Sequence, residues 1–554
     1  MNVIKKNILS FSPSRHVRAG KGLRHGATLL AVLAGLLSGC SEWDDHYDNT
    51  QVEGNNVTLW QEMAARPELS DFVEVLNSTK VFRQHKKTSV SYGDLLNGGQ
   101  TYTVFAPVNG TFNKDSLIAL TETAEGDSAV ERCFVKNHLA STLRSAADTT
   151  TTFRLLNGKF ITMKSDNAGD VSFEDSNVRT KNGVMHVMQS QLPYMLTIYE
   201  TMTQVPEFSS VGDVVKKYNK DVFDENASIS SGYVDGVPVY VDSVVYETND
   251  LMSSVGLFND EDSTYYVAIP SNNGWQKAWE KVTGHFKYAA NVEKGDSLQH
   301  YYASRAIFDY AVFSKTIQPD MNARIRNYRY DAQYPEYHVF FRPFDSDGLF
   351  GKAQGVKKCS NGYFYYYDEW PFTPQQTYFR KIEQEGENTW NITSNSGCSF
   401  AATSIDADSV SKGAYLYVRP QVANWTLTYK LSNTLSGKYD ICVVTLPHTI
   451  IQKNSKKRYK FTTSVQYVDA SGKAQTYNCI NPKTEKTEFE SEDYARIDTI
   501  VVAKAFEFPT CNYAQDNNNV TITIKQSARA SGADNTKFVR EMLLDCIFLR
   551  PTDN

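Results

Sequence analysis

The chain alternates between segments with helical spacing and segments with strand-like spacing of apolar residues. Residues 59–79 place apolar side chains three and four positions apart, the period of an amphipathic helix (Leu59, Met63, Leu69, Phe72, Val75 and Leu76). Residues 102–105 form a short β-branched and aromatic run that predicts a strand. Pro107 ends this strand because proline has no N–H to continue a ladder, and Asn109 suits the following turn. A strand–turn–helix corner is therefore predicted at residues 102–112.

The same corner recurs later in the chain. In YYVAIPSNNGW, residues 265–275, Pro270 aligns with Pro107, and Asn272 aligns with Asn109. Trp275 takes the place of Phe112. Downstream, SNGYFYYYDEWPF repeats the order of KNGVMHVMQSQLPY: an Asn-Gly turn, an apolar strand and a Pro-aromatic close. A recurring unit of this size indicates an array of related domains.

The first corner carries a family motif. TVFAPVNGTF, residues 103–112, resembles the first conserved box of the fasciclin (FAS1) family, and residues 182–194 resemble the second. The resemblance implies an α+β fasciclin domain at 57–200 and a diverged second one at 203–375. It also implies structural roles for His138 and His186, which lie at family positions, with Tyr365 replacing the second histidine in the second copy. Family members act mostly in adhesion and protein–protein contact.

Beyond residue 375 the pattern changes to short strand-length segments separated by turn residues. Such spacing is typical of an all-β sandwich with jelly-roll character, predicted here for residues 376–554. SGKYDICVV and LLDCIFLRP resemble the galactose-binding-like β-sandwich of many carbohydrate-binding modules, although Cys546 replaces the usual aromatic residue. That resemblance implies sugar binding. The predicted fold class is therefore multidomain, with two α+β fasciclin modules followed by an all-β sandwich.

The N-terminal segment predicts export and lipidation. Residues 1–39 contain six basic and no acidic residues, and their apolar run at 27–37 is shorter than the roughly 20 residues that span a bilayer. This predicts a signal peptide ending at residue 39. The preceding Leu-Ser-Gly and Cys40 resemble the bacterial lipobox, which implies a lipidated cysteine. An acidic tether follows at 40–56, and its start resembles the surface-export signal of Bacteroidetes lipoproteins (Ser41, Glu42, Asp44 and Asp45). The expected location is the cell-surface side of the outer membrane.

Charge and cysteine content narrow the range of partners. Removing the six basic residues of the signal leaves 51 basic and 63 acidic residues, a formal charge of −12. An acidic surface argues against nucleic acid and against anionic lipid, so the only predicted membrane contact is the lipid anchor. Seven cysteines follow Cys40, without a CxxC pair, which argues against a zinc ribbon. Cys442 and Cys546 lie in apolar runs and are expected to be buried.

No catalytic motif is evident. The chain lacks a Gly-x-Ser-x-Gly elbow, an HExxH motif, a P-loop and a Rossmann glycine pattern, so no catalytic residue, metal ligand or cofactor is predicted. A paired-carboxylate hydrolase stays open because its two acids need not be close in sequence. Aromatic residues are candidate ligand contacts because rings stack on sugars (Tyr365, Tyr366, Tyr367, Trp370, Trp390 and Trp425). The alternative interpretation of residues 363–372 is a core strand.

Eight Asp-Ser or Asp-Thr triplets resemble the O-glycosylation acceptor of the same phylum (Ser116, Ser128, Thr149, Ser243, Ser263, Ser297, Ser409 and Thr499). Together these features predict a non-enzymatic cell-surface lipoprotein. Its expected role is accessory to an outer-membrane importer of the SusC/SusD type, capturing glycan. One alternative is an adhesin that binds host or neighbouring-cell proteins through its fasciclin modules. A second is a hydrolase sited in the C-terminal domain.

Overall fold

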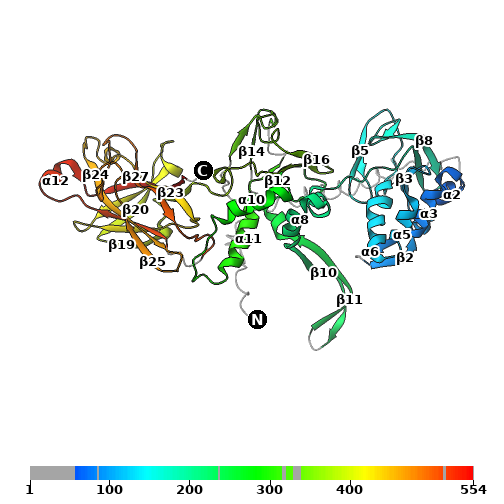
Figure 1. Ribbon diagram of the computed structural model, residues 1–554, viewed down its shortest axis with the longest axis horizontal. Coiled ribbons are helices and arrows are strands. Elements are labelled where there is room, and N and C mark those ends of the chain that lie inside the picture. The colour runs from blue at the N-terminus through cyan, green and yellow to red at the C-terminus, as the bar shows by residue number, and fades with distance from the viewer. Residues whose placement is uncertain are drawn as a thin grey trace, which may run out of the picture.

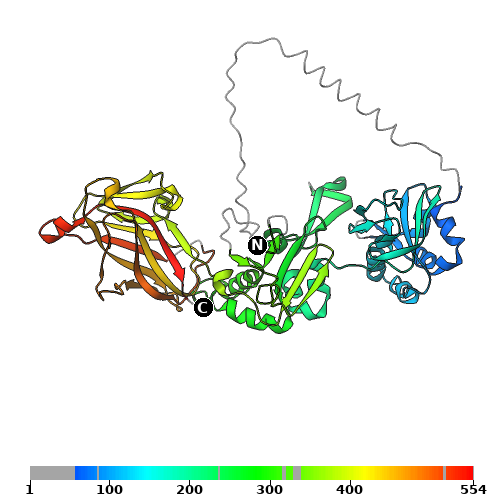
Figure 2. The same ribbon diagram turned by 90° about the horizontal axis from the view of Figure 1, so that it is seen from above.

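The computed structural model of the chain describes residues 56–83, 86–234, 237–314, 320–327, 338–515 and 520–552, without the side chains of 227 and 229–244. Cys40 and the predicted export residues lie outside this part (Ser41, Glu42, Asp44 and Asp45). Three bodies follow one another in chain order (Figures 1 and 2). None of the described helices combines the length and apolar character needed to cross a membrane.

The first body packs helices against one sheet. Its helices are α2 (Leu59–Ala64), α3 (Ser70–Ser78), α4 (Tyr92–Asn97), α5 (Lys114–Leu120) and α6 (Ala124–Val130). Its sheet has the order β4-β3-β9-β8-β7-β6-β5. The strands are β3 (Tyr102–Pro107), β4 (Leu139–Ala140), β5 (Thr151–Arg154), β6 (Phe160–Met163), β7 (Asn167–Ala168), β8 (Val171–Thr180) and β9 (Gly183–Met188), beside a hairpin of β1 (Lys80–Arg83) and β2 (Lys86–Ser91). All six apolar residues that predicted the first helices are fully buried.

Both family histidines of this body are structural. His138 is completely buried, with Nδ1 2.8 Å from the Phe134 carbonyl, and its Nε2 accepts from the Leu192 N–H at 2.9 Å. Burial lowers the pKa of His138 to about 4, so the ring is neutral at physiological pH. His186 is buried as well, with Nε2 2.9 Å from the Arg144 carbonyl. Their predicted structural roles are confirmed.

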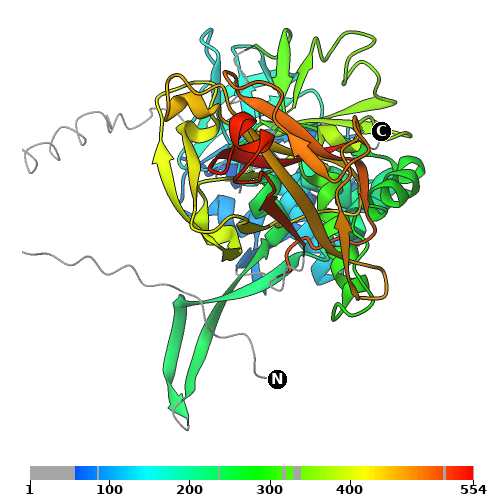
Figure 3. The ribbon, with the colours of Figure 1, turned by 90° about the vertical axis from the view of Figure 1, so that its left-hand side faces the viewer.

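The second body repeats this architecture with a smaller sheet, ordered β13-β12-β17-β16. Its strands are β12 (Tyr265–Pro270), β13 (Val312–Ser314), β16 (Gly355–Cys359) and β17 (Gly362–Tyr367), with a pair of β14 (Arg324–Arg326) and β15 (Val339–Phe341). Its helices are α7 (Ile198–Gln204), α8 (Ser209–Lys216), α9 (Asp250–Val255), α10 (Asn272–Thr283) and α11 (Gly295–Phe308). A long hairpin of β10 (Asn219–Val234) and β11 (Val237–Asn249) projects from this body (Figure 3).

The two copies agree at the level of single strand pairs. In the first, β3 and β9 are parallel and Phe105 faces His186; in the second, β12 and β17 are parallel and Ala268 faces Tyr365. Counting back from Pro107 and Pro270, these pairs occupy equivalent positions. Tyr365 therefore stands where the first copy has His186, as predicted.

The corner asparagines make the same bonds in both copies. Asn109 accepts from the Asp71 N–H at 2.9 Å and donates to the carbonyl of Pro67 at 2.8 Å. Asn272 accepts from the Ser210 N–H at 3.0 Å and donates to Pro206 at 2.8 Å. Each asparagine thereby ties the strand corner to the start of a helix, and the predicted second fasciclin-like fold is confirmed.

The third body is a β-sandwich. One sheet has the order β20-β21-β30-β23-β27, with β18 beside β30; the other has the order β19-β22-β28-β24-β25, with β26 and β29 beside β24. The strands are β18 (Ile382–Glu385), β19 (Ile392–Ser396), β20 (Cys398–Ser404), β21 (Ala414–Pro420), β22 (Thr426–Lys430), β23 (Gly437–Thr445), β24 (Arg458–Val468), β25 (Ala474–Asn478), β26 (Glu488–Glu490), β27 (Asp498–Phe508), β28 (Thr521–Gln526), β29 (Phe538–Val539) and β30 (Met542–Pro551), with one short helix, α12 (Ala533–Lys537). Along β24, buried residues alternate with more exposed ones, as one core-facing side requires.

Helices of the second body and strands of the sandwich share one apolar cluster. Ala278 and Val282 of α10 and Ile307 of α11 belong to the same buried cluster as Tyr439 and Leu549 of the sandwich. The second and third bodies are therefore joined by packing as well as by the chain.

The cysteines of the described part are free thiols. Cys442 on β23 and Cys546 on β30 are buried, as predicted. Burial raises the pKa of Cys442 to about 11, because an apolar surrounding disfavours the thiolate. Both act as small apolar core residues.

The buried carboxyl group of Asp545 on β30 is expected to make the stability of the sandwich depend on pH. It is 3% exposed; burial is the main cause that raises its pKa from 3.8 to about 6, and Glu385 and Glu387 add repulsion. The folded state thus holds this proton more tightly than the unfolded state, so stability falls as pH rises from about 4 to 6. Asp545→Asn is expected to recover up to about 3 kcal/mol at pH 7.5 while still accepting from the Ser411 N–H. Urea unfolding at pH 4 and 7.5 checks this, and an unchanged pH dependence would contradict it.

Candidate functional site

The aromatic residues predicted as ligand contacts do not form one surface. Tyr365 and Tyr366 are half-buried on opposite faces of β17, because neighbouring strand residues alternate. The Tyr365 ring stacks on Phe350 with centroids 4.4 Å apart, whereas the Tyr366 ring meets Phe208 at 5.2 Å. The core-strand interpretation describes this segment.

Two of these residues are structural, and their assignment as ligand contacts is wrong. Tyr367 is 3% exposed and its hydroxyl donates to the Leu349 carbonyl at 2.8 Å. Trp425 is 0% exposed and its Nε1 donates to the Arg540 carbonyl at 2.6 Å. Neither ring offers a face to a ligand, because core residues cover both.

The remaining candidates differ in exposure. Trp370 is half-buried, with its ring nearly parallel to that of Tyr378 at 6.3 Å, while Trp390 is 94% exposed. Among the predicted glycosylation residues, the exposed ones are Ser116, Thr149, Ser297, Ser409 and Thr499, and the half-exposed ones are Ser128 and Ser263. The side chain of Ser243 lies outside the described part. Glycosylation stays a prediction.

A cavity of about 580 Å³ lies among α8, α10, α11 and the base of the long hairpin, and is here named the helix cleft. It is lined by Ser210, Asp213, Val214, Lys217, Tyr218, Lys220, Asp250, Trp275, Gln276, Trp279, His300, Tyr301 and Ser304. Its volume falls within the roughly 300–1,000 Å³ of small-molecule sites.

Two indole rings dominate the helix cleft. Trp275 and Trp279 lie four residues apart on α10, so they emerge on the same helical face. Their planes differ by 20° and their centroids are 6.1 Å apart. His300 of α11 packs against Trp279 at 4.6 Å. Both tryptophans are partly exposed, which leaves ring surface open to a ligand.

Polar groups surround these rings. The hydroxyl of Tyr218 lies 3.1 Å from the Ser304 Oγ. Burial raises the pKa of Tyr218, so its side chain stays a neutral hydrogen-bonding group. Gln276 is exposed, and Lys220 forms an ion pair with Asp250. Asp213 and Lys217 also line the cleft and carry opposite formal charges. Flat apolar faces beside polar groups whose formal charges balance suit a ligand with both CH faces and hydroxyls, as a sugar has.

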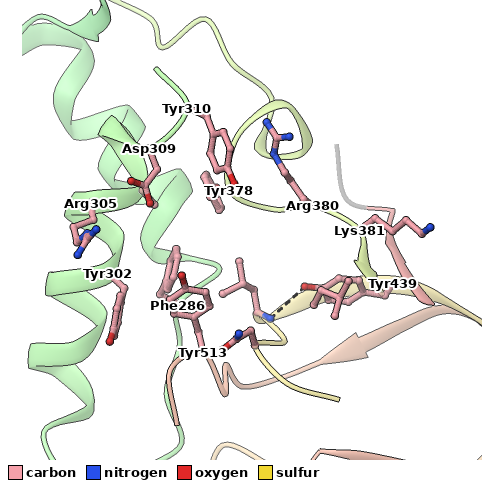
Figure 4. Close-up of a pocket in the computed structure, with 14 residues that line it drawn as sticks. Phe286, Tyr302, Arg305, Asp309, Tyr310, Tyr378, Arg380, Lys381, Tyr439 and Tyr513 are labelled. Carbon is pink, nitrogen blue, oxygen red and sulfur yellow. Dashed lines mark hydrogen bonds between the residues drawn. The ribbon is translucent and has the colours of Figure 1, made fainter. Parts of the chain in front are cut away.

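A second cavity, the junction pocket, lies on the other side of α11, between this body and the sandwich (Figure 4). Its volume is about 270 Å³. Its aromatic lining is engaged within itself: the rings of Tyr302 and Tyr513 meet at 5.1 Å, and the Arg380 guanidinium lies 4.0 Å from the Tyr310 ring centroid. Tyr310 has a left-handed backbone with φ +64°, which places its ring at the end of α11. These contacts join the second body to the sandwich, so we interpret the junction pocket as part of the interface between them.

Sequence reasoning missed the helix cleft. It noted Trp275 only as the counterpart of Phe112, and it did not single out Trp279, His300 or Tyr301. The available signal was the four-residue spacing of the tryptophans in NNGWQKAWEK. Within the described part, no group of three His, Cys, Asp or Glu residues is arranged to hold a metal ion.

Comparisons with known proteins place a fasciclin domain in the first body. The model of the Fasciclin domain matches residues 67–193. No curated protein matches the chain.

Several solved structures are similar at low identity. The FAS1 domain pair of the insect cell adhesion molecule Fasciclin I is 10% identical, with 50% of this chain and 90% of that chain covered and a TM-score of 0.19. The CBM22-1 xylan-binding domain from Paenibacillus barcinonensis Xyn10C is 11% identical, with coverages of 31% and 94% and a TM-score of 0.21. A Clostridium thermocellum endo-1,4-β-D-xylanase chain with CBM22-1 and GH10 modules is 12% identical, with 31% of this chain covered and a TM-score of 0.20. The match spans only 28% of that xylanase chain.

Proposed function

We propose that the protein is a non-enzymatic, lipid-anchored cell-surface protein that captures glycan in the helix cleft, as an accessory component of a SusC/SusD-type import complex. The lipobox-like segment at Cys40 and the acidic residues after it support the anchor and the outer-membrane surface location. Several acyl chains on one residue would give a lasting attachment, since a single chain binds membranes only marginally.

The observation that carries this proposal is the pair of nearly parallel indoles on α10. Sugar rings present CH faces that pack on aromatic rings, and their hydroxyls need polar partners nearby. The helix cleft supplies Trp275 and Trp279 for the first requirement, and Gln276 and Ser304 for the second.

Removing the indoles tests glycan capture. Trp279→Ala is expected to weaken glycan binding at least about tenfold, or roughly 1.4 kcal/mol, because it removes one stacking face. Gln276→Ala is expected to weaken binding less, since it removes a single exposed polar group. Titration calorimetry against neutral oligosaccharides measures both, with thermal unfolding to confirm the fold. Trp390→Ala is the matched control, because this exposed tryptophan lies outside the cleft. Equal affinity of the Trp279 variant and the control would refute glycan capture at this site.

The transporter role has its own test. Affinity purification of the native protein from outer membranes is expected to bring down a large β-barrel and its lid lipoprotein. A preparation free of both would refute the SusC/SusD association while leaving glycan capture intact.

One observation favours the adhesin alternative. The hairpin of β10 and β11 projects from the second body and exposes Val245 and Tyr246 near its base (Figure 3). Exposed apolar residues on a projecting strand pair are typical of protein contacts. Binding of a protein partner that survives loss of the indoles would favour this function.

A further inference from the structure

The first and second bodies enclose a groove of about 460 Å³, here named the intermodule groove. The first body contributes Lys159, Phe160 and Lys164 to its walls, and the second contributes Lys358 and Ser360. Residues of the helix cleft do not line it.

The intermodule groove is basic, although the chain as a whole is acidic. Its lining includes three lysines and one acidic residue, Asp170, whereas the chain has a formal charge of −6. Lys159 is compensated by Glu261 at 2.8 Å and by Glu200 at 3.5 Å. Lys164 and Lys358 are exposed, and no ion pair is found for either among the described residues. Two positive charges therefore face the groove from opposite bodies.

A buried clamp fixes the strand ends next to these two lysines. Lys159 Nζ donates to Ser360 Oγ at 3.0 Å, and Ser360 Oγ donates to Glu261 Oε1 at 2.8 Å. Lys159 directly precedes β6, after which Lys164 follows, while Ser360 directly follows β16, which carries Lys358. The clamp thus fixes the two strand ends that position the lysines, which reduces the ordering cost of binding.

The floor of the groove is apolar, and one half-exposed aromatic ring lies beside it. Leu155, Ile161 and Leu192 are buried beneath it. Phe160 is 47% exposed, and the Arg154 guanidinium lies 4.7 Å from its ring centroid. A ligand that fits has negative groups for the lysines and a CH face for the Phe160 ring.

The geometry points to a binding site for an acidic oligosaccharide, whose carboxylates contact Lys164 and Lys358 across the intermodule groove. A uronate chain combines repeated carboxylates with sugar-ring faces. An acidic peptide supplies the charges without such faces. This assignment rests on the proposed function only in taking a saccharide as the class of ligand. The binding site itself is a cavity separate from the helix cleft.

Charge reversal in the full mature protein tests the assignment. Lys164→Glu/Lys358→Glu is expected to weaken binding of tetragalacturonate at least about tenfold, because two attractive contacts become repulsive. Both side chains are exposed, so the variant should keep its thermal midpoint. Lys473→Glu/Lys537→Glu makes the same change in net charge at exposed positions of the sandwich and is expected to bind as wild type does. Higher salt is expected to weaken wild-type binding, since exposed charges are screened.

The outcomes separate this site from the helix cleft. Loss of tetragalacturonate binding in the groove variant, with retention in Trp279→Ala, supports the groove. Equal binding by the groove variant and its lysine control overturns it. Tetraglutamate binding as tight as tetragalacturonate would overturn the saccharide assignment. If only Trp279→Ala loses maltotetraose binding, that result tests the helix cleft. The intermodule groove is tested separately, by tetragalacturonate binding.

Discussion

Replacing Lys159 by alanine is expected to destabilise the junction of the first two bodies by about 3–5 kcal/mol. The Lys159 side chain is 7% exposed, and its partners Glu200 and Glu261 are 7% and 10% exposed. Removing one partner of a buried ion pair leaves the other charges without compensation in a poorly solvated site, which costs far more than an exposed pair contributes.

The electrostatics of Glu200 show why its carboxylate depends on cations. Burial by itself raises its pKa, but a hydrogen bond from Tyr194 at 2.6 Å, a backbone bond from Thr197, and the charges of Lys159 and Arg132 outweigh burial. The net pKa of Glu200 lies below its ordinary value. Loss of Lys159 removes one of these stabilising charges, so part of the cost appears as a weaker preference for the ionised carboxylate.

Calorimetric unfolding and small-angle scattering would measure the Lys159 variant, because the second method reports whether the two bodies still hold one arrangement. Lys159→Met/Glu261→Gln is expected to recover part of the loss, since a buried pair replaced on both sides leaves less uncompensated charge. Arg154→Ala removes an exposed contact to Asp262 across the same boundary and should change stability far less. Equal destabilisation by the Lys159 and Arg154 variants would contradict a special role for the clamp.

Local sequence patterns were sufficient to predict the repeated strand–turn–helix corner and the helices around it. Pro107 and Pro270 end equivalent strands, so the corner recurs where its sequence recurs. The bonds of Asn109 and Asn272 were not predicted, because they reach carbonyls 42 and 66 residues earlier in the chain and not the following turn. The alternating segments after residue 375 likewise predicted a sandwich, since each strand needs one buried side.

The candidate sites depend on contacts that no local pattern encodes. Lys159 meets Glu261 across 102 positions of sequence, and no motif in the sequence marks either residue. Trp279 and His300 meet only because α10 and α11 pack together. The periodicity of either helix alone shows which face each ring occupies, but it does not show that the two rings are in contact. The same limit explains the error at Trp425: strand alternation shows that one face is buried, but the partner sheet decides which face.

Trp425→Ala is expected to cost about 3–5 kcal/mol in the unfolding of the sandwich. The residue directly precedes β22, is 0% exposed and lies in the apolar cluster that the sandwich shares with α10 and α11. Truncation removes a large buried surface and opens a cavity, and it also leaves the Arg540 carbonyl without its indole donor. Trp425→Phe keeps most of the packing but not the donor, so an intermediate loss is expected.

Trp390→Ala is the matched control for this change, because it removes the same side chain from a position that is 94% exposed. It should shift stability by no more than about 0.5 kcal/mol. Urea unfolding followed by circular dichroism compares the variants without relying on the fluorescence of the residues removed. A Trp425 variant as stable as the Trp390 control, but with weakened glycan binding, would restore Trp425 as a ligand contact. A large loss of stability with glycan binding retained under folding conditions would establish it as a core residue.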